Sequence, residues 1–497
     1  MLTTLAAPAF ADIWHIENGD ITISAGESGN NVTQNNNTTY GDTNTIITNQ
    51  NKDTASSHTV TIEAKDKDDK VEVTLKDVNI DTSSRNKAAV SVTGEGDTNI
   101  KLDGDNALKS DIYRSGIYGS GSGSLTISGG ENDSLTAQGG SGANGISSSG
   151  SLTISGGTVT ANGDDGGRGI SSSGSVTISG GSTVTANGGS GTISGGDGIW
   201  SGGGVTISGG STVTANGGNG GSLVGGDGIR SGGGLTVSDG TVTAKGGNGD
   251  SKDGYGGDGI RSGGVVTISG NTVNAAGGYG GKVGGYGICS FDRVAISGGT
   301  VEAAGGNGST GGGSGIYSSV IDLSGSLELT AKAGSPNGRA LSQNGSELKL
   351  DDIKDKLGPG AKVTATDANG ETKQVSIPRP VEPEESSSSS DGGSAAPSAP
   401  ASPLPGLTVT DKDGQRISYT STQSGNTLTV CVGRLTASLH VSLAALRQLR
   451  AEGIETIAFQ TILCSTSLSV DELLTMGGED AEAVLTHRFT DSSLTVG

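Results

Sequence analysis

Cysteine is scarce in this chain, which has three cysteines in 497 residues. So few cysteines cannot form a disulfide framework, and the fold must depend on its core and its backbone hydrogen bonds. Cys431 and Cys464 lie near the C-terminus and could pair if they are adjacent, although two buried thiols are an equally good alternative.

Positive charge and aromatic side chains are also scarce. The chain has 31 lysines and arginines against 52 aspartates and glutamates, which gives a net charge of −21. This balance argues against nucleic acid as a partner, because nucleic-acid binding needs a basic surface. It is compatible with divalent cations or with simple solubility. Aromatic residues make up 3% of the chain, so any aromatic side chain on a flat outer face is notable.

Long hydrophobic runs are absent, and no segment is apolar enough over its length to span a bilayer. The N-terminus nevertheless suggests export, because the apolar run Leu2–Ala7 is followed by Ala9-Phe10-Ala11, a small-x-small cleavage pattern. We interpret residues 1–11 as the remnant of a signal peptide and expect a secreted or surface-displayed protein. An ordinary frayed N-terminus is the alternative.

Proline is missing between Pro8 and Pro336, as expected where most backbone N–H groups take part in a ladder of strands. Seven of the ten prolines fall between residues 378 and 405, together with the serine run 386–390. This composition predicts a linker that separates two independent domains.

Glycine is abundant, and a Gly-Ile pair recurs at intervals of 24 to 31 residues, with its isoleucine at Ile117, Ile146, Ile170, Ile199, Ile229, Ile260, Ile288 and Ile316. In most repeats two further apolar positions follow, in phrases such as Thr-Ile-Ser and Thr-Val-Thr. A repeat of this length indicates a solenoid or a related array, and alternating apolar and polar residues indicate strands. A flexible Gly/Ser linker would not explain isoleucines and valines in register.

The pattern predicts an all-β fold, a right-handed parallel β-helix with three faces and coils of about 28–30 residues. Val176 and Ile178 should point inward while Thr177 and Ser179 point outward, because side chains alternate along a strand. We expect residues 12–110 to form an N-terminal cap and irregular coils. Residues 111–377 should form the regular coils, with closing strands at 347–350 and 363–377.

Residues 406–497 form a different pattern, that of a small α+β domain. Strands are expected at 427–432, 435–441 and 454–462, and a hairpin at 483–496. Ser442 should cap a helix at 443–451, and Ser469 opens a capping box for a second helix.

The outward positions beside each isoleucine carry the candidate site. The residues directly after the isoleucines are Tyr118, Ser147, Ser171, Trp200, Arg230, Arg261, Cys289 and Tyr317, and those two positions before them include Asn144, Arg168, Asp197, Asp227, Asp258, Tyr286 and Ser314. Three consecutive coils therefore carry Asp-Gly-Ile followed by Trp or Arg. If the coils stack in register, a ladder of aspartates lies beside a row of one tryptophan and two arginines.

These residue types fit carbohydrate recognition. A tryptophan offers a flat face to a sugar ring, and arginine pairs with carboxylates such as those of uronic acids. We therefore predict Trp200, Arg230 and Arg261 as carbohydrate-binding residues, with Tyr118 and Tyr317 as further aromatic contacts. The candidate ligands for Ca²⁺ are the aspartates of the ladder, Asp197, Asp227 and Asp258. The alternative is that Asp and Arg neutralise each other while Trp200 covers a hydrophobic edge.

A second array has a threonine on each side of the valine in Thr-Val-Thr, at Thr158/Thr160, Thr183/Thr185, Thr212/Thr214 and Thr241/Thr243. Such a grid resembles those of ice-binding β-solenoids. Threonine is also simply a good strand residue, and the grid ends at Asn274 and Glu302, so ice binding is not the favoured interpretation.

The phrase Ile16-Glu17-Asn18-Gly19-Asp20-Ile21-Thr22-Ile23 and the repeated Leu-Thr-Ile-Ser-Gly-Gly-Thr-Val-Thr-Ala phrases resemble those of secreted bacterial right-handed β-helix proteins of the carbohydrate-binding type. The resemblance covers roughly residues 12–377. It implies binding of cellulose-like or polygalacturonate chains and of calcium. No site motif of that group can be transferred residue by residue.

We therefore expect a non-catalytic protein, a monomer, that binds an extracellular plant-type or acidic polysaccharide. The first alternative is a structural adhesin that uses the solenoid as a stalk for the C-terminal domain. The second is a polysaccharide lyase or hydrolase, since some of these enzymes share the solenoid and use only Asp, Arg and Lys. An exposed cleft with Trp200 and both arginines would favour binding, a featureless surface the stalk, and a buried aspartate cluster beside a basic residue an enzyme.

Overall fold

A computed structural model describes residues 12–378 and residues 406–496, the latter with gaps at 412–414, 418, 425, 433–435, 462–464, 477–481 and 488–491. The predicted signal-peptide remnant and nearly all of the predicted linker lie outside the described residues. The chain divides into two compact units, residues 1–382 and 383–497, and each is described by itself.

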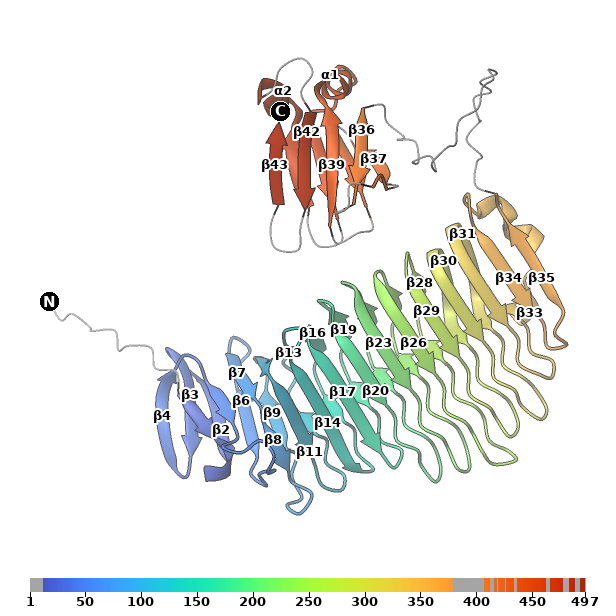
Figure 1. Cartoon of the computed structure of the whole chain (residues 1–497). Helices are drawn as coiled ribbons and strands as arrows, with labels where there is room; N and C mark the ends of the chain where they lie inside the picture. The colour runs from blue at the N-terminus through green and yellow to red at the C-terminus, as the bar shows by residue number, and fades with distance from the viewer. Residues whose placement is uncertain are drawn as a thin grey trace, which may run out of the picture. The chain divides into compact units, whose positions relative to one another are not determined.

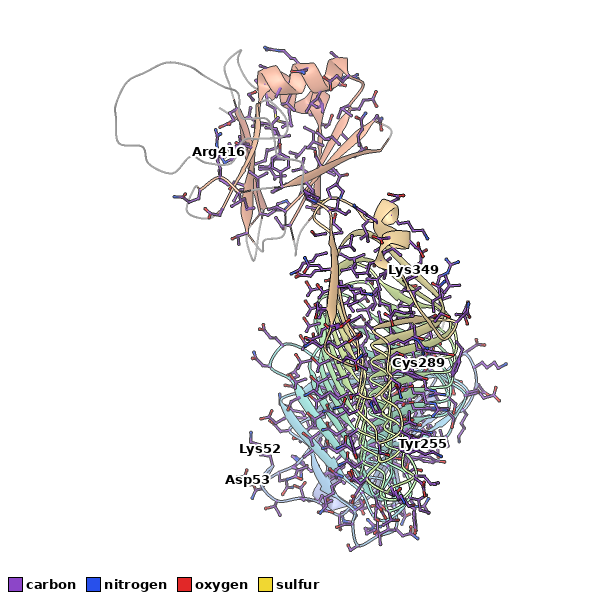
Figure 2. The ribbon with its side chains drawn as sticks, turned by 90° about the vertical axis from the view of Figure 1, so that its right-hand side faces the viewer. Lys52, Asp53, Tyr255, Cys289, Lys349 and Arg416 are labelled. Atoms are coloured by element: carbon purple, nitrogen blue, oxygen red, sulfur yellow. The ribbon has the colours of Figure 1, made fainter. Side chains whose placement is uncertain are left out.

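The first unit is a parallel β-solenoid of about 14 turns, which confirms the predicted parallel β-helix (Figure 1). It forms because each coil contributes one strand to each of three faces, and every strand pairs with its equivalent in the coils before and after it. Figure 2 shows the structure turned by 90°, with the coils overlying one another.

Face A contains the repeated isoleucines and is built from β2 (Ile21–Gly26), β6 (Val60–Ala64), β9 (Val90–Gly94), β12 (Ile117–Gly119), β15 (Ile146–Ser148), β18 (Ile170–Ser172), β21 (Ile199–Ser201), β24 (Ile229–Ser231), β27 (Ile260–Ser262), the first parts of β30 (Ile288–Ala304) and β31 (Ile316–Lys332), and β32 (Leu341–Gln343). Ile199, Ile229 and Ile260 are in register on neighbouring strands, as the repeat predicts.

Face B is built from β1 (Ile13–His15), β5 (Ile46–Thr48), β7 (Lys70–Lys76), β10 (Asp97–Asp103), β13 (Leu125–Ser128), β16 (Leu152–Ser155), β19 (Val176–Ser179), β22 (Val205–Ile207), β25 (Leu235–Val237), β28 (Val266–Ile268) and the middle parts of β30 and β31. Val176 and Ile178 are fully buried, and Thr177 and Ser179 are not, which confirms the predicted alternation.

Face C is built from β8 (Asn79–Asp81), β11 (Asp105–Lys109), β14 (Ser134–Ser141), β17 (Thr158–Asp164), β20 (Thr183–Asn187), β23 (Ser211–Asn216), β26 (Gly240–Lys245), β29 (Thr272–Ala276), the last parts of β30 and β31, and β34 (Lys362–Thr366). The two outward threonines of each Thr-Val-Thr are in register along this face, from Thr158 to Thr241 and from Thr160 to Thr243.

The core is a stack of aliphatic side chains inside the three faces, with no large aromatic ring among them. A central coil buries Ile170 on face A, Val176 and Ile178 on face B, and Val184 and Ala186 on face C. Each fully buried valine or isoleucine contributes about 1.5–3 kcal/mol relative to an exposed one. The contribution is realised only when a neighbouring coil covers it, so stability resides in the contacts between coils.

Both ends of the solenoid depart from the parallel pattern. At the first end the 3₁₀ helix η1 (Ile16–Asn18) precedes β2, and β3 (Gly29–Gln34) and β4 (Asn37–Asp42) pair antiparallel. At the second end β33 (Ser346–Glu347) and β35 (Thr372–Ser376) pair antiparallel with β32 and β34. The closing strand predicted at 347–350 is wrong beyond its first residue, because residues 348–349 are outside any strand and the 3₁₀ helix η2 (Leu350–Lys356), which buries Ile353, starts at Leu350.

The second unit has two four-stranded sheets. One contains β36 (Leu407–Thr410), β39 (Ala437–Ser442), β42 (Glu482–His487) and β43 (Ser492–Val496), and the other β37 (Thr420–Ser424), β38 (Thr427–Cys431), β40 (Thr456–Gln460) and β41 (Ser465–Ser469). Helices α1 (Leu443–Ala451) and α2 (Val470–Met476) complete it. The Ser442 hydroxyl accepts a hydrogen bond from the Ala445 N–H, as the predicted cap requires. Cys431 is a free thiol, and Cys464 lies outside the described residues.

Candidate functional site

The connection from face C to face A lengthens midway along the solenoid. It covers residues 165–169 between β17 and β18, but residues 188–198 between β20 and β21 and residues 246–259 between β26 and β27. Isolated parallel bridges within the longer connections join Ser194 to Val224, Val224 to Tyr255, and Tyr255 to Val283. The connections therefore form a wall that continues from coil to coil.

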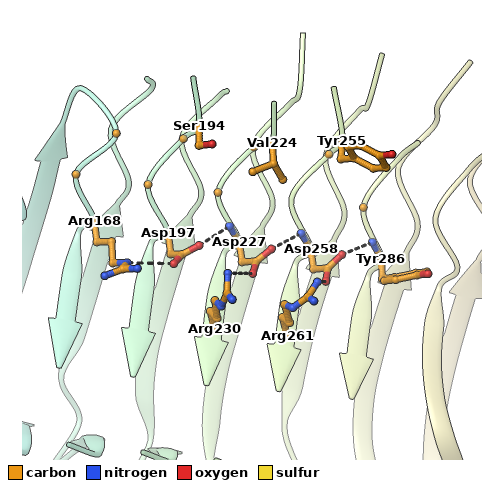
Figure 3. A pocket seen from close by; sticks show the side chains of 18 of the residues that line it. Arg168, Ser194, Asp197, Val224, Asp227, Arg230, Tyr255, Asp258, Arg261 and Tyr286 are labelled. Carbon is orange, nitrogen blue, oxygen red and sulfur yellow. Dashed lines mark hydrogen bonds and ion pairs between the residues drawn. The ribbon is translucent and has the colours of Figure 1, made fainter. Parts of the chain in front are cut away.

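A groove of about 800 Å³ lies along this wall (Figure 3). Its lining repeats with the coils and consists of the wall residues Ser194, Val224, Tyr255 and Val283, the column Asn144, Arg168, Asp197, Asp227, Asp258 and Tyr286, the side chains of Arg230 and Arg261, and the glycines between them. From the first to the last member of the column there are five steps of about 4.8 Å, so the groove extends for about 24 Å.

Each aspartate of the column accepts a hydrogen bond from a backbone N–H of the next coil. One carboxylate oxygen of Asp197 accepts the N–H of Asp227 at 2.9 Å, and one of Asp227 accepts the N–H of Asp258 at 2.7 Å. Asp258 accepts the Tyr286 N–H in the same way at 2.7 Å. Asn144 performs the same task for its neighbour at 2.8 Å although it cannot ionise. A side-chain acceptor at this position therefore binds the next coil with or without a charge, whereas Arg168 occupies the same position and accepts no such bond.

The second carboxylate oxygen of each aspartate faces an arginine. The distances from a guanidinium nitrogen to this oxygen are 3.2 Å for Arg168 and Asp197, 3.9 Å for Arg230 and Asp227, and 3.1 Å for Arg261 and Asp258. The aspartate side chains are 5–8% exposed, whereas those of the arginines are 35–49% exposed. Each pair is neutral as a whole when both members are charged. The arginine is the accessible member, so the groove offers guanidinium N–H groups above a buried row of carboxylates.

Burial raises the pKa of Asp227 well above its ordinary value, and the neighbouring Asp258 and Asp197 raise it further. The pKa of Asp258 is also raised by burial, against the opposing effects of the Tyr286 N–H and Arg261. Two like charges on adjacent coils cannot both be held at low cost in a dry environment. Asp227, the middle member, is therefore readily protonated.

The predicted aromatic residues lie in different places. Trp200, Arg230 and Arg261 occupy three consecutive strands in register, which confirms the predicted row. The Trp200 ring is half-buried beneath the guanidinium of Arg168, whose central carbon lies 4.4 Å from the ring centroid, and Trp200 does not line the groove. Tyr118 is 43% exposed but lies three strands before Trp200 on face A.

Tyr317 stacks on Tyr286, with ring centroids 4.9 Å apart and an interplanar angle of 18°. Tyr286 is the last residue of the groove lining, so this aromatic pair closes the groove at its C-terminal end. Phe291 lies beside it and is exposed, with the Arg261 guanidinium carbon 5.0 Å from its ring centroid. This end of the groove therefore carries the aromatic side chains of Tyr286, Phe291 and Tyr317.

Two of the residues that follow a repeated isoleucine are in register with outward-facing neighbours but are not exposed. Ser171 is buried, and Cys289 is completely inaccessible. Cys289 lies in register between Arg261 and Tyr317, whose longer side chains cover it. Burial raises the pKa of its thiol to about 12.

The sequence repeat placed Arg168 two positions before an isoleucine but did not assign it to the site, and it did not predict Val224 or Tyr255 as site residues. These two residues come from the lengthened connections, which break the strand pattern. A signal was nevertheless present, since Val224 and Tyr255 each lie three residues before an aspartate of the column, as Ser194 does. Equal spacing outside the strands therefore indicated a third repeating position.

The three aspartates do not fit a calcium site. Calcium takes six to eight oxygen ligands, whereas each of these carboxylates already accepts a backbone N–H and faces an arginine. Nowhere in the described ranges, 12–378 and most of 406–496, do three or more His, Cys, Asp or Glu side chains form a group that could hold a metal ion. Calcium binding stays a prediction from the resemblance alone.

The fold and the groove together define the class of this protein, a parallel β-helix with an open groove along its coils. No protein-family model, no curated protein and no solved structure matches the chain. The resemblance to carbohydrate-binding β-helix proteins therefore stays a prediction. Among the residues that the structure describes, no helix is long and apolar enough to cross a membrane.

Proposed function

We propose that this protein is a non-catalytic binding protein for an extracellular polysaccharide, with acidic glycans favoured, and that the groove is its binding site. The observation that carries the proposal is the row of half-exposed arginines along a groove of about 24 Å. A groove of this length suits a polymer better than a small molecule. Secretion is part of the proposal and depends on the cleavage pattern near the N-terminus.

The two sides of the groove suit the two kinds of surface that a sugar presents. On one side Arg230 and Arg261 offer fixed forks of N–H donors, which match carboxylates and can also reach hydroxyls. On the other side Val224 and Tyr255 are exposed and offer apolar contact to the C–H faces of a ring. Asp258 holds Arg261 by a hydrogen bond of 3.1 Å, so fewer rotations of that side chain are lost on binding. Arg230 lies 3.9 Å from its own aspartate and is held less tightly.

A polysaccharide lyase is the second candidate, because the groove contains a buried carboxyl of raised pKa, Asp227, beside Arg230. Perturbed pKa values often mark active sites, but buried structural networks produce them as well. Asn144 accepts the same backbone hydrogen bond without an ionisable group, so a structural role accounts for the carboxyls of the column. The buried aspartates beside arginines nevertheless match the arrangement expected of an enzyme, and Trp200 lies outside the groove. Binding is favoured over catalysis by the half-exposed Arg230 and Arg261 and by the length of the groove.

The test is retention of the full-length protein by a panel of immobilised polysaccharides, including polygalacturonate and cellulose, with calcium and with a chelator. Unsaturated product is followed at the same time by ultraviolet absorbance. We expect retention by polygalacturonate without product. Arg230→Ala should weaken binding at least about fivefold, whereas the matched control Arg293→Ala, an exposed arginine of β30 outside the groove, should not.

Three results would change the conclusion. Retention by no glycan would overturn the proposal and leave the stalk as the better interpretation. Accumulation of unsaturated product would identify a lyase. Equal weakening by Arg230→Ala and Arg293→Ala would show nonspecific charge attraction instead of a site in the groove.

A further inference from the structure

The groove has a periodicity of its own. Two of its central coils contribute the same cross-section, a wall residue, a buried aspartate and an arginine three positions later that pairs with that aspartate. These residues are Val224, Asp227 and Arg230 in one coil, then Tyr255, Asp258 and Arg261 in the next. The equivalent members are joined by parallel bridges and pairs, Val224 to Tyr255 and Arg230 to Arg261. The preceding coil contributes Ser194 and Asp197, but Trp200 stands in the place of the arginine and Asp197 pairs with Arg168.

The spacing of this pattern is fixed by direct contact between backbones. A methyl group on Gly226 would lie 1.9 Å from the carbonyl oxygen of Gly196 in the preceding coil, so nothing larger than glycine fits between the two coils. Hydrogen bonds from Gly218 to Gly196 and from Gly247 to Gly226, both of 2.8 Å, repeat the same contact. The groove therefore has a rigid repeat of about 4.8 Å.

A ligand that contacts several coils must match this repeat or lose contacts as it extends. A 1→4-linked chain of pyranose rings advances by close to one coil rise for each ring. We infer that the groove binds a linear polymer in register with the coils, one monomer unit to each coil. This inference rests on the proposed function and specifies how the monomers of the ligand are spaced relative to the coils.

The experiment is calorimetric titration of the full chain with galacturonic acid oligomers of increasing length. The affinity should rise with each added unit until the oligomer spans the coils from Asn144 to Tyr286, about six units at one unit per rise of about 4.8 Å, and then level off. We call the oligomer length at which the affinity stops rising the break. A break at two or three units would overturn the inference, while binding itself would still support the proposed function.

A deletion variant tests the register directly. Removal of residues 199–228 joins Gly198 to Ile229 and deletes one coil of the groove, but it preserves the Asp-Gly-Ile-Arg phrase at the junction. The matched control removes residues 288–315, a coil beyond the groove lining, and joins Gly287 to Ile316. It also disturbs the stack of Tyr317 on Tyr286, so we expect it to lower the affinity for all lengths alike without changing the length at which the affinity levels off. We expect the break to move one unit shorter in the first variant and to stay in place in the second.

An unchanged break in the first variant, or an equal shift in both, would overturn the inference. Circular dichroism melting establishes that each variant folds, and if either does not, the position of the wild-type break decides alone. If neither polygalacturonate nor any oligomer binds, the proposed function fails, and that outcome is distinct from binding with a misplaced break.

Discussion

The first coils and the central coils of the solenoid use their outward polar side chains differently. In residues 12–110 these side chains join distant parts of the chain. Asp20 accepts hydrogen bonds from Arg85 at 2.7 and 3.1 Å, from Lys87 at 3.0 Å and from the Thr59 N–H at 3.0 Å, and it faces His58 at 3.1 Å. In the central coils, hydrogen bonds between the glycine backbones of successive coils share this task with side chains such as those of Asp197 and Asp227.

The difference shows what a regular repeat makes available. Where glycine backbones hold neighbouring coils in contact, the outer side chains are not all needed for cohesion, and some can form a binding surface. Arg85 is committed to Asp20, whereas Arg230 lies 3.9 Å from its partner and stays half exposed. The groove therefore occurs where the repeat is most regular.

The largest loss of stability is expected when a side chain is added at a glycine that contacts the backbone of the neighbouring coil. Gly226→Ala would place a methyl group 1.9 Å from the Gly196 oxygen, which should cost about 3 kcal/mol because the coils would have to separate. Gly181→Ala is the control, since Gly181 has φ of +70° but open space around its Cβ position. Its cost should be about 1 kcal/mol. Thermal melting by circular dichroism compares them, and equal losses would contradict the backbone-contact argument.

The next effect concerns the first coils. Asp20→Asn removes the carboxylate that Arg85 and Lys87 share and should cost about 1–2 kcal/mol, a reduced figure because Asp20 is a third exposed. Burial alone would raise the pKa of Asp20, but the hydrogen bonds from Arg85 and Lys87 bring it well below its ordinary value of 3.8.

A depressed carboxyl pKa stabilises the fold above the unfolded value and loses that effect as the pH falls through the folded value. The difference in melting temperature between wild type and Asp20→Asn should therefore be constant at neutral pH and shrink below about pH 4. A difference that persists unchanged at low pH would show that Asp20 acts through packing and not through charge.

The aspartates of the column should change the stability of the fold with pH in the opposite direction. Because the pKa of Asp227 is raised, its contribution to stability is complete at low pH and is lost as the pH rises through the folded value. Asp227→Asn keeps an acceptor for the Asp258 N–H and should melt a few degrees above wild type at pH 8, with no difference near pH 4. A less stable variant at both pH values would mean that the pairing with Arg230 outweighs burial.

The smallest effect is a difference in thiol reactivity between Cys289 of the solenoid and Cys431 of the second unit. Cys289 is inaccessible and its pKa is raised to about 12, so iodoacetamide at pH 8 should not modify it in the native protein. Cys431 is partly accessible and should react. Peptide mass mapping before and after denaturation reports both residues. Native modification of Cys289 would indicate that the coil beneath Arg261 and Tyr317 opens.

The sequence predicted the coils because their requirements are local and repeated. Ile199, Ile229 and Ile260 had to lie in register, and this placed Trp200, Arg230 and Arg261 in a row. The register alone could not show that long side chains cover shorter ones on the neighbouring strands. It therefore missed the burial of Cys289 between two longer neighbours, and it placed Tyr118 with a site from which two serine-bearing strands separate it.

The groove itself was beyond prediction from the strand pattern. Its second side comes from connections whose length varies, and their path depends on bridges such as Val224 to Tyr255 that form only after the coils stack. The aspartates were predicted to lie together, but their engagement with the backbone depends on the orientation of each carboxylate. Only the equivalent positions of Asn144 and Asp197 hinted that the side-chain oxygen, and not the charge, binds the next coil.

The two ends of the solenoid have a consequence for its behaviour at high concentration. A parallel stack that simply stopped would present unpaired N–H and C=O groups in the same direction and spacing as its own next coil, and would act as a template for another copy. The antiparallel strands β3 and β4 at one end, and β33 and β35 at the other, reverse the chain at these edges. They break the translational symmetry that fibre growth requires, so a chain built on an amyloid-like spacing has a defined length.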